Sequence, residues 1–150
     1  IKANTIETSV AVLNNTNYKI TVIPEGDRIV TANRNSPIIA LNGADNVTID
    51  GLSFTENNRL TIRNTAGASA IQIFGAAANN LIRRCTLEAS GINNSIIVIS
   101  TDNSGNAENN TIEDNYLRPV SSNGVGRGIF IGTNSPSVTG RINNTLIKNN

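Results

Sequence analysis

One short unit occurs four times in this sequence, and the repeat limits the folds that are open to the chain. Each copy begins with asparagine, continues with a short apolar stretch and ends in a polar turn. The copies are Asn46–Leu52, Asn79–Leu87, Asn109–Leu117 and Asn143–Asn150. Because one such unit cannot bury its apolar side alone, repeats of this kind stack and bury a continuous core. The repeat therefore predicts a solenoid.

The segments between the repeats have the pattern of strands and turns. Short apolar runs such as Ile20–Ile23, Arg28–Thr31 and Pro37–Leu41 alternate with Pro24–Asp27 and Asn33–Ser36. A period of two between Gly, Pro and Asn is typical of β-strands joined by turns. The sequence has no sustained helical spacing of apolar residues. We therefore expect an all-β chain, folded as a right-handed parallel β-helix.

The central isoleucine of each unit marks one coil. Successive anchors lie 13, 20, 30 and 35 residues apart, at Ile49, Ile62, Ile82, Ile112 and Ile147. A gap of 13 residues is too short for a full coil, so either Ile49 and Ile62 face different sides or the coil is irregular there. The other gaps fit coils of about 20 residues with insertions. We expect Ile62, Ile82, Ile112 and Ile147 to form one inward column.

A second strand follows each anchor strand, and extra residues lie around it. The second strands are Ala70–Phe74, Ser95–Ile99 and Gly128–Gly132, and the insertions are 91–94, 101–109, 121–127 and 133–140. In repeat proteins such insertions often carry the binding residues. We expect any ligand to contact these loops.

Neighbouring coils place equivalent residues above one another, because parallel strands stack at about 4.8 Å. Leu87 and Leu117 are expected to form a second inward column. Asparagine suits the bends, because it tolerates left-handed backbone conformations and its amide can bond the asparagine of the next coil. Cys85 occupies the place of Asn115 and Asn150 in other coils, so we interpret it as a buried structural thiol.

Charged residues directly after the anchors are the candidate binding residues. They are Asp50, Arg63, Arg83, Glu113 and Lys148. If they stack, Glu113 lies between Arg83 and Lys148, where opposite charges attract, whereas Arg63 above Arg83 is repulsive. The simpler interpretation is a solvated face with modest ion pairing.

The composition agrees with thin stacked layers and excludes some partners. With 3% aromatic residues and no Met or Trp, the core is left to Ile, Leu, Val and Ala. The net charge of +1 gives no electrostatic reason to expect nucleic acid or an anionic membrane as partner. One cysteine excludes an internal disulfide, and no signal peptide or membrane span is recognisable. We expect residues 1–150 to form a single β-helix domain, truncated at both ends from a longer chain.

The order of three motifs resembles a known family. Leu41–Gly51 is followed by Leu60–Thr65 and then by Asn-Asn-Thr-Ile coils such as Asn109–Ile112. These resemble the parallel β-helix segments of large secreted proteins of Bacteroidota, which commonly end in a type IX secretion sorting domain. The resemblance implies a structural or adhesive module that is secreted or held at the bacterial cell surface. Surface glycans and the secretion machinery are the partners it implies.

An enzyme is the competing class, because parallel β-helices often act on polysaccharides. Inverting hydrolysis needs two carboxyl groups about 6.5 to 9.5 Å apart, and metal-dependent lyases need a carboxylate cluster around Ca²⁺. Here Asp50 is alone on its strand, Glu113 and Asp114 diverge to opposite faces, and His is absent. We expect no catalytic residue and no cofactor. A polysaccharide lyase or glycoside hydrolase, and type IX cargo without activity, are the alternatives.

Two further patterns allow a functional interpretation. The Arg83–Arg84 pair suits an acidic sugar, although solvated or ion-paired arginines are more common. The segment Asp102–Glu108 has the oxygen-rich, glycine-containing character of a Ca²⁺ loop but lacks the spacing of an EF-hand. We expect an ordinary turn there and no metal site.

Overall fold

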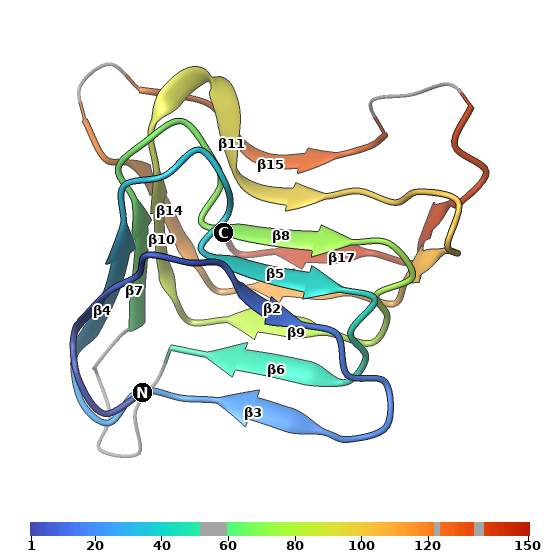
Figure 1. Cartoon of the computed structure of the whole chain (residues 1–150), viewed down its shortest axis with the longest axis horizontal. Helices are drawn as coiled ribbons and strands as arrows, with labels where there is room; N and C mark the ends of the chain where they lie inside the picture. The colour runs from blue at the N-terminus through green and yellow to red at the C-terminus, as the bar shows by residue number, and fades with distance from the viewer. Residues whose placement is uncertain (52–59, 122–123, 134–136) are drawn as a thin grey trace.

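The structure is a computed structural model that describes residues 1–51, 60–121, 124–133 and 137–150. The regular elements of these residues are all β-strands, so the expectation of an all-β chain is confirmed. The chain winds through successive coils, and equivalent strands stack in parallel (Figure 1). The prediction of a parallel β-helix is therefore confirmed. None of the described segments is a helix long and apolar enough to span a membrane.

Three five-stranded sheets, here called A, B and C, take one strand from each coil. Sheet A contains β1 (Thr5–Ile6), β4 (Arg28–Ala32), β7 (Leu60–Asn64), β10 (Thr86–Ala89) and β14 (Tyr116–Pro119). Sheet B contains β2 (Ala11–Leu13), β5 (Ile39–Asn42), β8 (Ile71–Phe74), β11 (Gly91–Ile99) and β15 (Val125–Ile131). Sheet C contains β3 (Ile20–Val22), β6 (Val47–Asp50), β9 (Leu81–Arg83), β13 (Thr111–Glu113) and β17 (Leu146–Lys148). A short fourth sheet pairs β12 (Ala107–Glu108) with β16 (Ile142–Asn143).

Asparagine turns the chain at the corner that precedes sheet C. Four residues there have positive φ angles between 51° and 60°, namely Asn46, Asn79, Asn109 and Asn144. This is the left-handed region, which asparagine tolerates better than other residues with a side chain. The role predicted for asparagine at the bends is confirmed at this corner. The corner after sheet C uses Arg84, Asp114 and Asn149 in the same conformation.

The core consists of aliphatic columns from all three sheets, and sheet B contributes two of them, one of Ile39, Ile71 and Ile97 and one of Leu41, Ile73 and Ile99. In sheet C the inward column is Val22, Ile49, Ile82, Ile112 and Ile147. In sheet A the inward column contains Val30, Ile62, Leu87 and Leu117. The prediction that Ile82, Ile112 and Ile147 share a column is confirmed.

The placement of Ile62 in the column of Ile82 was wrong. Ile62 pairs with Leu87 in sheet A, whereas Ile82 pairs with Ile49 in sheet C. The gap of 13 residues reflects this change of sheet, because Ile49 ends one coil and Ile62 begins the next. The alternative in which Ile49 and Ile62 face different sides is the correct one.

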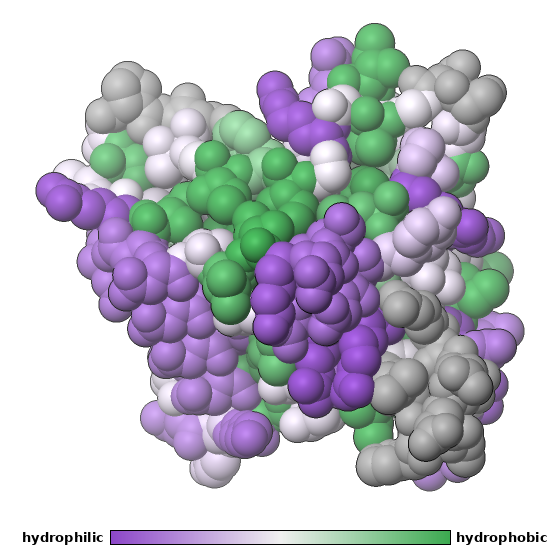
Figure 2. Space-filling view, turned by 180° about the vertical axis from the view of Figure 1, so that it is seen from behind, coloured by the Kyte–Doolittle hydropathy of each residue, from purple (hydrophilic) through white to green (hydrophobic). Residues whose placement is uncertain are grey.

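Apolar surface remains open at both ends of the solenoid. In the last coil Ile131, Leu146 and Ile147 are 40% to 49% exposed. From behind, hydrophobic residues gather between two bands of hydrophilic ones (Figure 2). At the first coil an apolar recess of about 390 Å³ opens onto core residues such as Val22 and Ile49. Neighbouring coils therefore cover the aliphatic columns in the middle of the described structure, and the columns are open to solvent at its two ends.

Candidate functional site

Four of the five predicted binding residues form one outward column on sheet C. The register pairs Asp50 with Arg83, Arg83 with Glu113, and Glu113 with Lys148. Glu113 therefore lies between Arg83 and Lys148, as predicted, and its Oε2 is 3.0 Å from Lys148 Nζ. The hydrogen bond to Glu113 raises the pKa of Lys148.

Arg63 does not belong to this column. It lies on β7 of sheet A, where it pairs with Thr31 and Glu88. The expected repulsion between Arg63 and Arg83 was therefore wrong, because the anchors Ile62 and Ile82 that precede them belong to different sheets.

Asp50 binds both arginines of the Arg83–Arg84 pair. Its side chain is only 8% exposed, its Oδ2 lies 2.9 Å from Arg83 Nη2, and its Oδ1 accepts a 2.9 Å hydrogen bond from Arg84 Nε. The hydrogen bond to Asp50 raises the pKa of Arg84, against the opposing effect of its burial. The ion-paired interpretation of these arginines is thus confirmed, and they hold adjacent coils together.

A second charge cluster on sheet A was missed by the sequence reasoning. Glu88 is 2% exposed and forms ion pairs with Arg63 and Arg118 of the neighbouring coils. Burial favours the neutral acid, but the hydrogen bonds from Arg63 and Arg118 outweigh it and lower the pKa of Glu88. Alignment of the coils on Leu87 and Leu117 would have revealed this cluster, because Glu88 directly follows Leu87 and Arg118 directly follows Leu117.

Acid is expected to destabilise the fold through Glu88. Because its pKa is lowered in the folded state, this carboxylate contributes stability above its unfolded pKa of 4.5 and loses it as the pH falls below that value. Urea unfolding at pH 7 and at pH values down to 3 measures the effect. Glu88→Gln should be less stable than wild type at pH 7 and should have a weaker pH dependence. An unchanged pH dependence in Glu88→Gln would contradict the assignment.

Buried side-chain amides of asparagine also connect neighbouring coils. Asn80 Oδ1 accepts from Val47 N at 2.9 Å, and Asn80 Nδ2 donates to Ala44 O at 2.8 Å and to Asn110 Oδ1 at 3.0 Å. Asn110 Nδ2 continues the ladder to Ala77 O at 2.9 Å. The prediction that asparagine bonds to asparagine of the next coil is confirmed here.

Cys85 lies at the end of a similar ladder. Its backbone N–H donates to Asn115 Oδ1 at 3.0 Å, and Asn115 Nδ2 donates to Asn150 Oδ1 at 2.9 Å. The thiol is buried. Cys85 therefore occupies the place of the asparagines, as predicted.

The segment Asp102–Glu108 contains a turn at residues 103–104 and ends in β12. Asp102 Oδ1 accepts from Ser104 N at 2.7 Å, and Glu108 Oε1 accepts from Asn106 and Asn143 at 3.0 Å. Across residues 1–51, 60–121, 124–133 and 137–150, no group of three or more His, Cys, Asp or Glu is placed to hold a metal ion.

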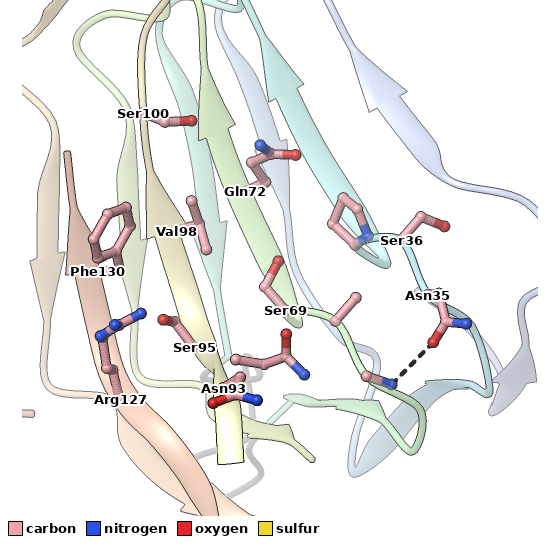
Figure 3. Close-up of a pocket in the computed structure, with 14 residues that line it drawn as sticks. Asn35, Ser36, Ser69, Gln72, Asn93, Ser95, Val98, Ser100, Arg127 and Phe130 are labelled. Carbon is pink, nitrogen blue, oxygen red and sulfur yellow. Dashed lines mark hydrogen bonds between the residues drawn. The ribbon is translucent and has the colours of Figure 1, made fainter. Parts of the chain in front are cut away.

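A groove of about 560 Å³ runs along the outer face of sheet B. Gln72, Val98 and Phe130, which stack in register on β8, β11 and β15, line its floor (Figure 3). Asn35 and Ser36 lie on one side, and Arg127 lies beside Phe130 on the other. The groove thus joins residues of four coils into one surface, with a floor that combines Gln72 with the apolar Val98 and Phe130 and with a polar rim.

An irregularity between β11 and β15 builds one wall of this groove. The register of the two strands shifts between Gly91 and Ser95, within a predicted insertion. Gly126 allows β15 to lie close to β11, because a Cβ at this position would overlap the backbone oxygen of Ile92. Two predicted insertions, 91–94 and the described part of 121–127, therefore meet at the groove. Residues 122–123 and 134–136 of the insertions lie outside the described residues.

Two serines line this groove, and neither hydroxyl is among the fully buried side-chain atoms without a partner, so both hydroxyls reach the groove. Ser69 is 7% exposed and Ser95 is 4% exposed, and both line the groove from neighbouring coils. A hydroxyl at the wall of a groove can both donate a hydrogen bond to a polar ligand and accept one from it. These hydroxyls make the groove a better candidate site than the ion-paired columns. Sequence reasoning did not select them.

Fold and groove together define the class, a parallel β-solenoid with a polar groove on one sheet. No protein-family model, curated protein or solved structure matches the chain.

Proposed function

We propose that this protein is a rigid β-helix module that binds a glycan chain in the groove along sheet B. The hydroxyls of Ser69 and Ser95, which line the groove, carry this proposal. Sugars expose hydroxyl groups that would hydrogen bond to these serines, and C–H faces that would pack on Val98 and Phe130. The combination of two apolar floor residues and several polar groups suits such an amphipathic ligand.

The ladders support a role as a stiff spacer. Backbone pairing, the asparagine amides and the ion pairs of Asp50 and Glu88 all connect one coil to the next. In such a solenoid each coil contacts only its neighbours, so stiffness extends along the axis. A stiff rod would present the groove at a fixed distance from its attachment point.

Secretion and localisation at the bacterial cell surface are part of the same proposal. The resemblance of Leu41–Gly51 and Leu60–Thr65 to secreted β-helix proteins of Bacteroidota supports it. The test is to treat intact cells with protease and probe for the protein. Cleavage in wild-type cells and retention inside cells that lack type IX secretion is the expected result. Protection from protease in both strains would contradict it.

Binding is tested by screening the purified chain on a glycan array and titrating the best ligands by calorimetry. Phe130→Ala should weaken binding about tenfold or more, because it removes the aromatic part of the floor. Val12→Ala is the matched control, since Val12 is exposed on the outer face of sheet B but does not line the groove. Both variants should keep the wild-type circular dichroism spectrum.

Other results would replace this proposal. Shortened polysaccharide products in the same incubations would favour a polysaccharide lyase or glycoside hydrolase. Absence of binding to every glycan would favour type IX cargo without activity in this part of the protein. Equal loss of binding in Val12→Ala and Phe130→Ala would place the ligand outside the groove.

A further inference from the structure

Charge is unevenly distributed in the groove. Arg127 is the charged residue in its described lining, and no Asp or Glu is among those lining residues. The carboxylates of sheets A and C are engaged elsewhere, since Asp50 pairs with Arg83 and Glu88 with Arg118. A positive charge therefore lies in an otherwise neutral groove.

The environment of Arg127 leaves its guanidinium available. It lies over the ring of Phe130, with Cζ 5.1 Å from the ring centroid, and has no ion-pair partner within the described ranges. Stacking on an aromatic ring restrains a guanidinium while its N–H groups remain able to donate. Such a group binds a carboxylate through two parallel hydrogen bonds.

Arg127 is also aligned with the two serines that line the groove. The register pairs it with Ser95, and Ser69 lies on the next coil along the same sheet (Figure 3). Three polar groups from successive coils thus follow the solenoid axis, across the strands. A ligand that reaches all of them is a chain of several sugar units lying along that axis.

We infer that the groove takes an oligosaccharide that contains uronic acid, with one carboxylate on Arg127 and hydroxyls of neighbouring units on Ser95 and Ser69. This inference rests on the proposed glycan binding and specifies its ligand. The binding is reversible and involves no covalent step.

The test compares oligogalacturonate with the same oligomers after reduction of their carboxyl groups, using the purified chain and calorimetry. Wild type should bind the acidic form at least about tenfold more tightly. Arg127→Gln should remove this preference and leave binding of the reduced form unchanged. Arg141→Gln is the control, because Arg141 is exposed in the last coil and does not line the groove. Higher salt should weaken acidic binding in wild type more than in Arg127→Gln.

The outcomes of this test distinguish the inferred uronate binding from the proposed glycan binding on which it rests. Equal binding of both forms, unaffected by Arg127→Gln, would overturn the uronate assignment and keep the glycan groove. A sulfated galactan bound as tightly as the uronate would also overturn it, because charge alone would then suffice. Binding of neither form nor of any other glycan would overturn both.

Discussion

Replacing Asn80 with alanine is expected to lower the free energy of unfolding by about 4 kcal/mol. The substitution leaves the N–H of Val47 and the carbonyl of Ala44 without the partner they have in the folded state. It also removes the amide that donates to Asn110 Oδ1. Asn80 is 1% exposed, so water cannot easily replace these bonds. Urea unfolding followed by circular dichroism measures the loss.

Asn33→Ala is the matched control for this experiment. Asn33 is exposed, and its replacement should change the free energy of unfolding by less than about 0.5 kcal/mol. If Asn80→Ala were as stable as Asn33→Ala, the buried amide ladder would contribute little. In that case the backbone pairing and the aliphatic columns would account for the cohesion of the coils.

The sheet C column could be predicted from the sequence because its residues keep a constant local pattern. Ile82 and Ile112 follow an asparagine pair after one intervening residue and Ile147 follows one after two, and most of the change in their spacing comes from insertions elsewhere in the coil. The same pattern placed Glu113 between Arg83 and Lys148. A repeat motif reports register reliably when it belongs to the same sheet in every coil.

The sheet A column was only partly predictable for the opposite reason. Ile62 is preceded by a polar segment and followed by Arg63-Asn64, so its local sequence resembles that of the sheet C units. Its true neighbours, Val30 and Leu87, carry different flanking residues. Local similarity therefore assigned Ile62 to the wrong sheet, and the Glu88 ion pairs were missed with it.

The groove could not be predicted from the sequence, because it depends on contacts between four coils. The insertion 91–94 indicated where regularity breaks, but not that it would form a wall beside Phe130. Ser69 and Ser95 have nothing distinctive in their local sequence. Their importance comes from their position in the lining of the groove, which follows only from the packed structure.

Replacing Ile82 with alanine is expected to lower the free energy of unfolding by about 3 to 4 kcal/mol. Ile82 is fully buried in the middle of the sheet C column, between Ile49 and Ile112. Because the coils on both sides fix the spacing of the strands, the surrounding side chains cannot move in to fill the cavity that the substitution leaves. Leu81→Ala, one residue earlier and only partly buried, should cost less than about 1.5 kcal/mol in the same urea titration. Similar losses in the two variants would show that the isoleucine column does not hold the coils together, and the rigid rod on which glycan presentation depends would lose its physical basis.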